Sequence, residues 1–262
     1  MNLIQHIKWH VKTILESHPI GYYIGNKVIN MTDAFLPHEE DFHGFKKLFT
    51  DNNGLFLDIG ANDGKSARSF HKLFQDWKIF SVEANSLHVP TLTKLKNKLS
   101  GFDFIIGAIG DKNQELTLYT PIYKNIVIHS AASIDLNQVK RQMKKQFRKQ
   151  TILDNIRFEQ TTAKAIHLDD LNLAPQIIKI DIEGMEHIAL ENLEKTILKN
   201  NPTILVEYNP ANFDRILHYM SDKGYLACGY NIAEDQIVKF QVTHRNCFFI
   251  PKEKEGLITT NR

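Results

Sequence analysis

Residues 55–67, LFLDIGANDGKSA, decide the fold of this chain, because an apolar run ends there in a turn rich in glycine. The first five residues are typical of a short buried strand, and the residues after Gly64 have the pattern of a helix. Phe70, Leu73 and Phe74 would form the inward face of that helix. A strand, a glycine turn and a helix in succession predict the first unit of an α/β sheet.

The alternation of strands and helices continues along the chain, and it predicts parallel strands with right-handed crossovers in one doubly wound sheet. The final two strands lack a helix between them, which predicts an antiparallel addition near one edge. The predicted strands are residues 55–59, 78–84, 102–110, 161–171 (an edge strand), 176–184, 202–210, 224–232 and 246–251, with a strand and loop over 115–135. The predicted helices are residues 3–15, 38–49, 65–75, 89–99, 137–150, 185–199 and 211–223.

The composition of the chain is that of an ordinary globular protein, with 262 residues, 42% hydrophobic and 24% charged. A net charge of +2 gives no reason to expect a general affinity for nucleic acid or anionic membranes. Cys228 and Cys247 are expected to be free thiols in a reducing compartment, with a disulfide between neighbouring strands as the alternative. No apolar run reaches the roughly 18 residues of a membrane span, and the charged N-terminus does not resemble a signal peptide. A cytoplasmic location is therefore predicted.

The N-terminal residues 3–15 carry apolar residues at helical spacing. We expect this amphipathic helix to pack on its own domain or on a sister subunit, and a peripheral contact with a membrane is the alternative. The predicted division of the chain is an N-terminal helical extension over 1–50 and a main domain over 51–262. The main domain carries an insertion over 121–160.

The glycine turn fits one nucleotide-like ligand better than two others. An ATPase loop needs four residues between its glycines and no acid, whereas Gly60 and Gly64 enclose three, and Asp58 and Asp63 carry the wrong charge. A nicotinamide loop needs a middle glycine where this chain has Asn62. S-adenosylmethionine carries an ammonium and a sulfonium, so a carboxylate at the strand end and a glycine for close backbone approach suit it.

A second acid supports this interpretation. Glu83 ends the next strand, 25 positions after Asp58, where a carboxylate would accept hydrogen bonds from the hydroxyls of a ribose. Asp111 follows the third strand and would accept from the adenine amino group, and a turn is its other interpretation. The candidate cofactor-binding residues are Asp58, Gly60, Ala61, Asn62, Gly64, Ser66, Glu83, Ala84, Asn85, Ala108, Ile109 and Asp181.

The segment IIKIDIEG, residues 177–184, carries the candidate chemistry. Strand periodicity places Lys179, Asp181 and Glu183 on one side and three isoleucines on the other. A buried Lys179 needs a partner, and Glu207 on the neighbouring strand is the expected one. A hydroxyl that attacks a methyl group loses a proton, so a base nearby helps. The candidate catalytic residues are Asp181, Glu183, His187 and Glu207.

No metal is predicted to take part, and Mg²⁺ held by Asp181, Glu207 and Asn209 is the minority alternative.

These residues resemble the FkbM-type S-adenosylmethionine-dependent methyltransferases. The resemblance covers residues from about Leu55 to about Tyr225, and it is carried by FLDIGANDG, SVEAN, GAIGD, IHLDDL, IIKIDIEGMEHIALEN and PTILVEYN. It implies a class I methyltransferase fold, a Rossmann-like, mostly parallel seven-stranded sheet in the order 3-2-1-4-5-7-6 with one antiparallel strand near an edge. It also implies O-methyl transfer to a hydroxyl of a glycan or a small metabolite.

The segment QVKRQMKKQFRKQ, residues 138–150, predicts a basic amphipathic helix with six cationic residues around an apolar stripe. A solvated cap over the domain and a docking surface for an anionic acceptor or membrane are both open, and His129 and Ser130 would lie near such an acceptor. The helix also leaves a nucleic-acid methyltransferase as a rival function. A binding or assembly protein with this fold and no turnover is a second rival.

Overall fold

The computed structural model describes residues 18–21, 23–24, 40–51, 53–110, 114–128, 131–182 and 184–259. The chain forms two compact units, which we call unit 1 (residues 1–36 and 115–163) and unit 2 (residues 37–114 and 164–262). The predicted helix at residues 3–15, with its subunit or membrane contact, lies outside the described residues, as do Asp111, His129, Ser130 and Glu183. The predicted boundary at residue 50 stays a prediction.

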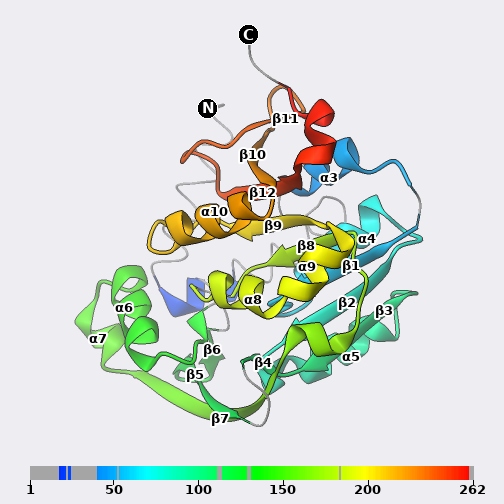
Figure 1. The fold of residues 1–262 in the computed structure, drawn as a ribbon. Coiled ribbons are helices and arrows are strands. Elements are labelled where there is room, and N and C mark those ends of the chain that lie inside the picture. Colours follow the sequence, from blue (N-terminus) through cyan, green and yellow to red (C-terminus); the bar gives the residue numbers. More distant parts are fainter. Residues whose placement is uncertain are drawn as a thin grey trace. The chain divides into compact units, whose positions relative to one another are not determined.

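Unit 2 is built on an eight-stranded sheet in the order β11-β10-β12-β9-β8-β1-β2-β3 (Figure 1). Its central strands are parallel, while β12 is antiparallel to both of its neighbours and β11 is antiparallel to β10. The strands are β1 (Leu55–Ile59), β2 (Lys78–Glu83), β3 (Phe102–Ile106), β8 (Ile177–Ile180), β9 (Thr203–Glu207), β10 (Tyr225–Asn231), β11 (Gln236–Lys239) and β12 (Asn246–Pro251).

This order confirms the doubly wound class I arrangement, because seven of the strands follow the predicted 3-2-1-4-5-7-6. The predicted number of strands was one too low. Strand β11 is the eighth strand and lies at the edge of the sheet. It is antiparallel to β10, to which a short hairpin connects it. Sequence periodicity missed it because a four-residue edge strand is too short to give a clear pattern.

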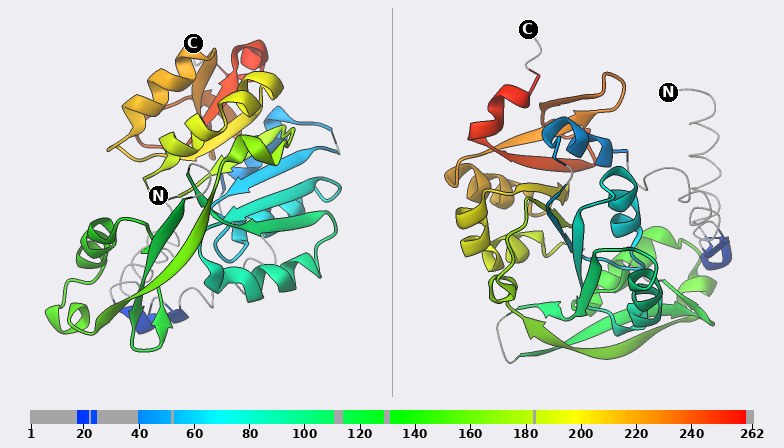
Figure 2. Two further views of the ribbon diagram at one scale, coloured as in Figure 1. Left: turned by 60° about the horizontal axis from the view of Figure 1, so that its bottom comes forward. Right: turned by 90° about the vertical axis from the view of Figure 1, so that its right-hand side faces the viewer.

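Helices cover both faces of this sheet (Figures 1 and 2). One face packs on residues of α3, α4 and α5 in an apolar cluster, which we call the first cluster. The other face packs on residues of α8, α9 and α10 in the second cluster. The helices are α3 (Phe42–Leu48), α4 (Lys65–Leu73), α5 (Val89–Lys96), α8 (Glu186–Asn192), α9 (Glu194–Asn200) and α10 (Phe213–Asp222), with 3₁₀ turns at Ser86–His88 and Lys252–Leu257.

The two cysteines lie on opposite faces of the sheet. Cys228 on β10 belongs to the first cluster and Cys247 on β12 belongs to the second, and both are buried free thiols. Burial raises the pKa of Cys228 to about 12. The alternative of a disulfide between neighbouring strands is therefore wrong, because the sheet separates the two sulfur atoms.

The third predicted strand, residues 102–110, is divided at Gly107. Strand β3 pairs with β2, whereas β4 (Ala108–Ile109) pairs with the end of β7. A Cβ atom at Gly107 would lie 2.8 Å from a methyl group of Ile166, so glycine lets the two backbones approach where the chain changes partners. The sequence prediction of one continuous strand was wrong because that neighbour is distant in sequence.

The predicted helix at 185–199 is interrupted at Leu193, between α8 and α9. The carboxylate of Asp169 accepts hydrogen bonds from the backbone of Lys195 at 3.0 Å and from that of Thr196 at 2.9 Å, so it caps the second helix. Asp169 lies in a 3₁₀ turn, Leu168–Leu171, where the predicted strand 161–171 has already ended at Ile166. Asp169 lies 26 residues before Lys195 in the chain, so the helical pattern of residues 185–199 by itself does not show that a new helix begins there.

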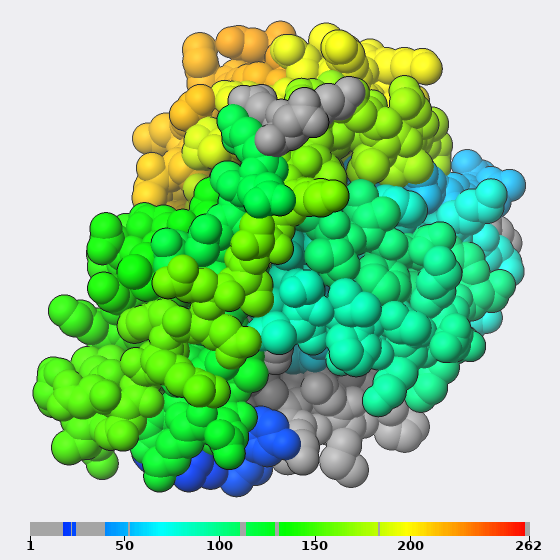
Figure 3. All heavy atoms as spheres, turned by 90° about the horizontal axis from the view of Figure 1, so that it is seen from below, coloured from blue at the N-terminus to red at the C-terminus, as the bar shows by residue number. Residues whose placement is uncertain are grey.

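Unit 1 contains strands β5 (Glu115–Tyr123), β6 (Ile126–Val127) and most of β7 (Ile156–Ile166), with helices α6 (Leu136–Gln146) and α7 (Gln150–Leu153). In Figure 3 the described residues of this unit from 115 onward that face the viewer are green to yellow-green. Val139, Met143 and Phe147 lie in the core of the unit, which confirms the predicted apolar stripe. In the described part of the chain no helix is both long and apolar enough to cross a bilayer.

Candidate functional site

Four carboxylates lie at the carboxyl ends of four neighbouring parallel strands. Asp58, Glu83 and Glu207 are near the ends of β1, β2 and β9, and Asp181 directly follows β8. Each acid is two or four positions after a residue of the first cluster, so strand periodicity directs all four toward the same face. In an open α/β sheet this edge, at the change of winding, is where ligands bind. The strand ends therefore bring together residues that are far apart in the sequence.

The glycine turn after β1 is shaped by its neighbours. Gly60 has φ +89°, and a Cβ atom there would overlap the carbonyl oxygen of Asp181. The amides of Gly60 and Ala61 donate to the carbonyl of Val82 at 2.9 and 3.1 Å, which joins the turn to β2. Glycine is thus required because the backbones after β1 and β8 touch at this point.

The rest of the turn leads directly into α4. Asn62 has φ +51°, which an asparagine tolerates, and Gly64 has φ +80° at the N-cap of the helix. Lys65 lies 3.9 Å from Asp63, and the guanidinium of Arg68 donates to the backbone carbonyl of Asp63 at 2.8 Å. The lysine that resembles a phosphate-binding residue therefore sits beside a carboxylate of its own turn.

Glu83 holds two loops in place. Its carboxylate accepts a hydrogen bond from the amide of Asn62 at 2.7 Å and another from the amide of Asn85 at 2.7 Å. The side chain is buried, and burial raises its pKa to about 7; the neighbouring Asp58 also raises it, while the backbone amides of Asn85, Asn62 and Ala84 lower it by less. A carboxylate offers about four lone-pair positions, so acceptor capacity remains for a ligand.

The side chain of Asp58 is fully buried and accepts a hydrogen bond from the hydroxyl of Ser81 at 3.1 Å. The strand register places Asp58 opposite Lys179, whose ammonium lies 3.0 Å from the carboxylate of Asp181. Lys179 is 4% exposed, so the prediction of a buried lysine with an acidic partner is confirmed. The partner that the structure gives is Asp181, whereas the expected Glu207 lies 3.7 Å from Arg245.

The remaining candidate cofactor-binding residues surround these strand ends. Ser66 is buried at the start of α4, and the side chain of Asn85 accepts from the amide of Leu87 at 3.1 Å. Ile109 is part of the second cluster. The other three residues of this set, all small and with little surface, are Ala61 and Ala108, which are buried, and Ala84, which is half-buried.

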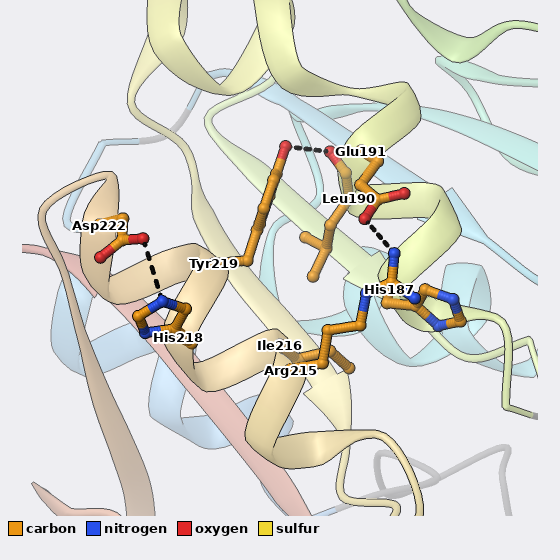
Figure 4. A pocket seen from close by; sticks show the side chains of 8 residues that line it. All are labelled: His187, Leu190, Glu191, Arg215, Ile216, His218, Tyr219 and Asp222. Carbon is orange, nitrogen blue, oxygen red and sulfur yellow. Dashed lines mark hydrogen bonds and ion pairs between the residues drawn. The ribbon is translucent and has the colours of Figure 1, made fainter.

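His187 lies in a different place from the acids. It lines a groove of about 210 Å³ between α8 and α10, together with Leu190, Arg215 and Tyr219 (Figure 4). Helix α8 covers the face of the second cluster, whereas the acids point to the other face. The polar groups of the groove are largely paired, since Arg215 lies 2.7 Å from Glu191 and the Tyr219 hydroxyl donates to the Leu190 carbonyl at 3.2 Å.

Glu186 and Asn212, which are far apart in the sequence, form a hydrogen bond at the ends of the loops that follow β8 and β9. Glu186 is 1% exposed and accepts a hydrogen bond from the side chain of Asn212 at 2.7 Å. Nothing in the sequence relates Glu186, at the start of one helix, to Asn212, just before another. Only the packing of the loops after β8 and β9 brings them together.

The alternative of a Mg²⁺ site stays untested. No group of three or more histidine, cysteine, aspartate or glutamate side chains is arranged to hold a metal ion among the residues described above. The side-chain oxygen of Asn209 accepts from the amide of Ala211 at 3.1 Å.

Comparisons with known proteins place the chain in a family. A family model described as the methyltransferase FkbM domain matches residues 58–230. A comparison with curated proteins gives no match. The solved structures similar to the chain include a methyltransferase FkbM from Methylobacillus flagellatus KT, with 14% identity, 76% of this chain and 43% of that chain covered, and a TM-score of 0.47. This chain therefore spans less than half the length of that relative.

Two further structures are similar over most of their length. A fibrillarin from Aeropyrum pernix, in complex with natively bound S-adenosyl-L-methionine, has 11% identity, 81% of this chain and 77% of that chain covered, and a TM-score of 0.42. A putative caffeoyl-CoA O-methyltransferase from Staphylococcus aureus has 11% identity, 79% and 80% covered, and a TM-score of 0.40. The family model extends over more than half of the sequence, and so the chain belongs to the methyltransferase FkbM domain family.

Proposed function

We propose that this protein is an S-adenosylmethionine-dependent O-methyltransferase that acts on a hydroxyl of a glycan or a small metabolite. The observation that carries the proposal is the set of four carboxylates at neighbouring strand ends, with Glu83 tied to the backbone of both adjoining loops. Carboxylates attract a nucleoside that carries a positive charge and repel a polyphosphate. Lys65 does not make the site positive, because it lies beside the carboxylate of Asp63.

The residues present fit this cofactor. Glu83 keeps acceptor capacity beyond what its amide partners use, and a ribose hydroxyl would donate to it. Asp58 and Asp181 supply negative charge for the amino group and the sulfonium. The turn over Gly60, Ala61, Asn62 and Gly64 brings backbone rather than bulky side chains to the strand ends. Ser66, Ala84, Asn85, Ala108 and Ile109 complete the proposed binding surface.

When bound, S-adenosylmethionine supplies a methyl group on a cationic sulfur. In the proposed reaction the acceptor oxygen forms a bond to the methyl carbon as the carbon–sulfur bond breaks, and the hydroxyl proton passes to a base. Asp181 is the proposed base, because it is partly exposed at the strand end and Lys179 orients its carboxylate at 3.0 Å. Glu183 and Glu207 remain proposed alternatives for that proton, whereas His187 lies in the groove between α8 and α10, away from the acidic strand ends.

Isothermal titration with S-adenosylmethionine tests the cofactor assignment. We expect the wild-type protein to bind, and Glu83→Ala to weaken binding at least about tenfold, or about 1.4 kcal/mol, because the ribose acceptor is lost. Glu191→Gln is the control, since Glu191 forms an ion pair with Arg215 between two helices. Unchanged binding by Glu83→Ala would rule out its role at the ribose.

A methyl-transfer assay tests the acceptor class. The wild-type protein would be incubated with S-adenosylmethionine that carries a radiolabelled methyl group and with a cell extract, which is then separated into lipids, glycans, metabolites, nucleic acid and protein. Label in glycans or metabolites is the expected result. If the protein binds the donor and labels no fraction, a binding or assembly role without turnover replaces the enzymatic one.

A nucleic-acid methyltransferase is the second candidate, and one observation favours it. The basic residues on and just after α6 are all exposed, as a phosphate-binding surface requires. They are Lys140, Arg141, Lys144, Lys145, Arg148 and Lys149. Label in the nucleic-acid fraction, lost after charge reversal of these residues, would favour this function over the first.

A further inference from the structure

Glu186 is a buried acid that takes part in a closed ring of hydrogen bonds. Its carboxylate accepts from the amide of Gly184 at 2.8 Å and from the side-chain nitrogen of Asn212 at 2.7 Å. The same nitrogen also donates to the carbonyl of Gly184 at 3.2 Å. We call these three hydrogen bonds the loop clamp.

The orientation of the Asn212 amide in the loop clamp is fixed by chemistry. A carboxylate and a backbone carbonyl are both acceptors, so only the nitrogen of Asn212 can face them. Its oxygen must therefore point away from the clamp, and this atom is buried without a protein partner. A rotated amide would oppose oxygen to oxygen twice.

The position of the loop clamp relates it to the proposed chemistry. Gly184 lies three residues after Asp181, in the loop that follows β8, and its φ of +94° reverses the chain before α8. Asn212 lies five residues after Glu207, in the loop that follows β9. The clamp therefore joins the two loops that continue from two of the four acidic strand ends.

Two other contacts already hold α8 to α10. Arg215 pairs with Glu191, and the hydroxyl of Tyr219 donates to Leu190, both in the groove of Figure 4. Arg215 and Glu191 are 60% and 46% exposed, so their pair contributes little to stability. These two contacts join the helices without burying a charged group. The loop clamp, in contrast, buries the carboxylate of Glu186, and burying a charged group costs free energy. The buried carboxylate therefore needs a reason other than joining the two helices.

We infer that Glu186 and Asn212 are positioning residues, which set the spacing between the Asp181 loop and the Glu207 loop where the acceptor hydroxyl must lie. This inference rests on the proposed function. The two side chains act through the backbone of Gly184, which leads directly to Asp181, and they do not touch the reacting atoms. A small displacement of a catalytic group reduces the rate while the donor still binds.

A reciprocal exchange of the two side chains tests the inference. In Glu186→Gln the new amide nitrogen must face a donor in either orientation, the nitrogen of Asn212 or the amide of Gly184, and in Asn212→Asp two carboxylates face one another. The double variant restores the hydrogen bond between the two side chains with its direction reversed, because the introduced glutamine would donate to the introduced aspartate. The carbonyl of Gly184 still loses its donor in this variant. We expect each single variant to slow methyl transfer at least about tenfold, and the double variant to recover most of that rate.

Two further measurements separate positioning from folding. The affinity for S-adenosylmethionine should stay within about twofold in all three variants, and hydrogen exchange of residues 181–185 should be faster in the single variants only. Glu191→Gln, which alters the exposed pair between the same helices, should keep the wild-type rate. Single variants that transfer methyl groups at the wild-type rate, or that lose donor affinity together with thermal stability, overturn the positioning role.

The failure of the proposed function is distinguishable from the failure of this inference. Wild-type protein that binds no S-adenosylmethionine and labels no acceptor overturns both. Wild-type transfer with no rescue by the double variant overturns the positioning role alone.

Discussion

The charged residues that bear on function are placed in opposite ways in the two units. In unit 2, Asp58, Glu83 and Lys179 are buried, and each is held by a hydrogen bond or an ion pair from a neighbouring residue. In unit 1, the basic residues of α6 are exposed, while Val139 and Met143 on the same helix fill the core. The first group is built into the interior of the sheet, whereas the second group lies in solvent.

This difference determines how substitutions should be interpreted. A change at the strand ends is expected to alter both stability and binding. It therefore needs a control substitution that strains the backbone to the same extent or that makes the same chemical change elsewhere. A change on the exposed face of α6 should leave the fold almost unaltered, because solvent already surrounds these side chains.

Gly60→Ala should have the largest effect. The new Cβ atom would overlap the carbonyl of Asp181 and would also strain a backbone at φ +89°. We expect a loss of about 3–5 kcal/mol in the free energy of unfolding, measured with urea, and a loss of S-adenosylmethionine binding. Gly224→Ala is the matched control, since φ is +81° there and no atom lies within 4 Å. Equal losses in the two variants would show that contact with Asp181 is unimportant.

Glu83 should make stability fall as pH rises. Its folded pKa of about 7 is above the ordinary value of 4.5, so the folded state binds more protons than the unfolded state between these values. The stabilising contribution is complete below pH 4.5 and is lost as pH rises through 7, with a total of about 3 kcal/mol. Urea unfolding at about pH 5 and about pH 8 should show this decrease in the wild type and not in Glu83→Gln. An identical pH dependence in both proteins would contradict the assignment.

Asp169→Ala should have a moderate effect. The carboxylate caps α9 through the amides of Lys195 and Thr196, and it also accepts from the Thr196 hydroxyl at 2.7 Å. We expect a loss of about 1–2 kcal/mol in thermal or urea unfolding, while S-adenosylmethionine still binds. Asp76→Ala, at an exposed turn, should change stability by less than about 0.5 kcal/mol. A loss of donor affinity in Asp169→Ala would show that the cap also shapes the site.

Removal of charge from α6 should have the smallest effect on the fold. Changing Lys144, Lys145 and Arg148 together to glutamine should alter the free energy of unfolding by less than about 0.5 kcal/mol, because all three are exposed. If the surface binds single-stranded RNA, the slope of log affinity against log salt should decrease by about 2. The matched control is Lys94→Gln with Lys98→Gln, two exposed lysines of unit 2. A large loss of stability would show that these charges belong to the fold.

The sequence predicted most of unit 2 because its signals are local. Apolar runs such as residues 55–59 and 177–180 identified central strands, and the positions of Asp58 and Glu83 at strand ends followed from them. Predictions were wrong where a distant residue intervenes. Gly107 ends β3 because Ile166 lies beside it, and Asp169 divides α8 from α9 from outside both helices.

The candidate site shows the same division. Residue types and spacing alone indicated a carboxylate-rich site for a cationic nucleoside, since the charge of a ligand and the charge of its site must be complementary. The partners of those residues were decided by tertiary structure. Lys179 pairs with Asp181, Glu83 holds the amides of Asn62 and Asn85, and Glu186 meets Asn212.

The sequence by itself determined the apolar faces and the acidic strand ends, because each depends on patterns within about ten residues, and the strand order was implied by the resemblance to a family. Only the tertiary structure decided why Gly60 must be glycine and how the loops after β8 and β9 are joined. Both depend on contacts between backbones that lie far apart in the chain. A chain specifies such contacts through the packing of whole elements, and no short segment carries them.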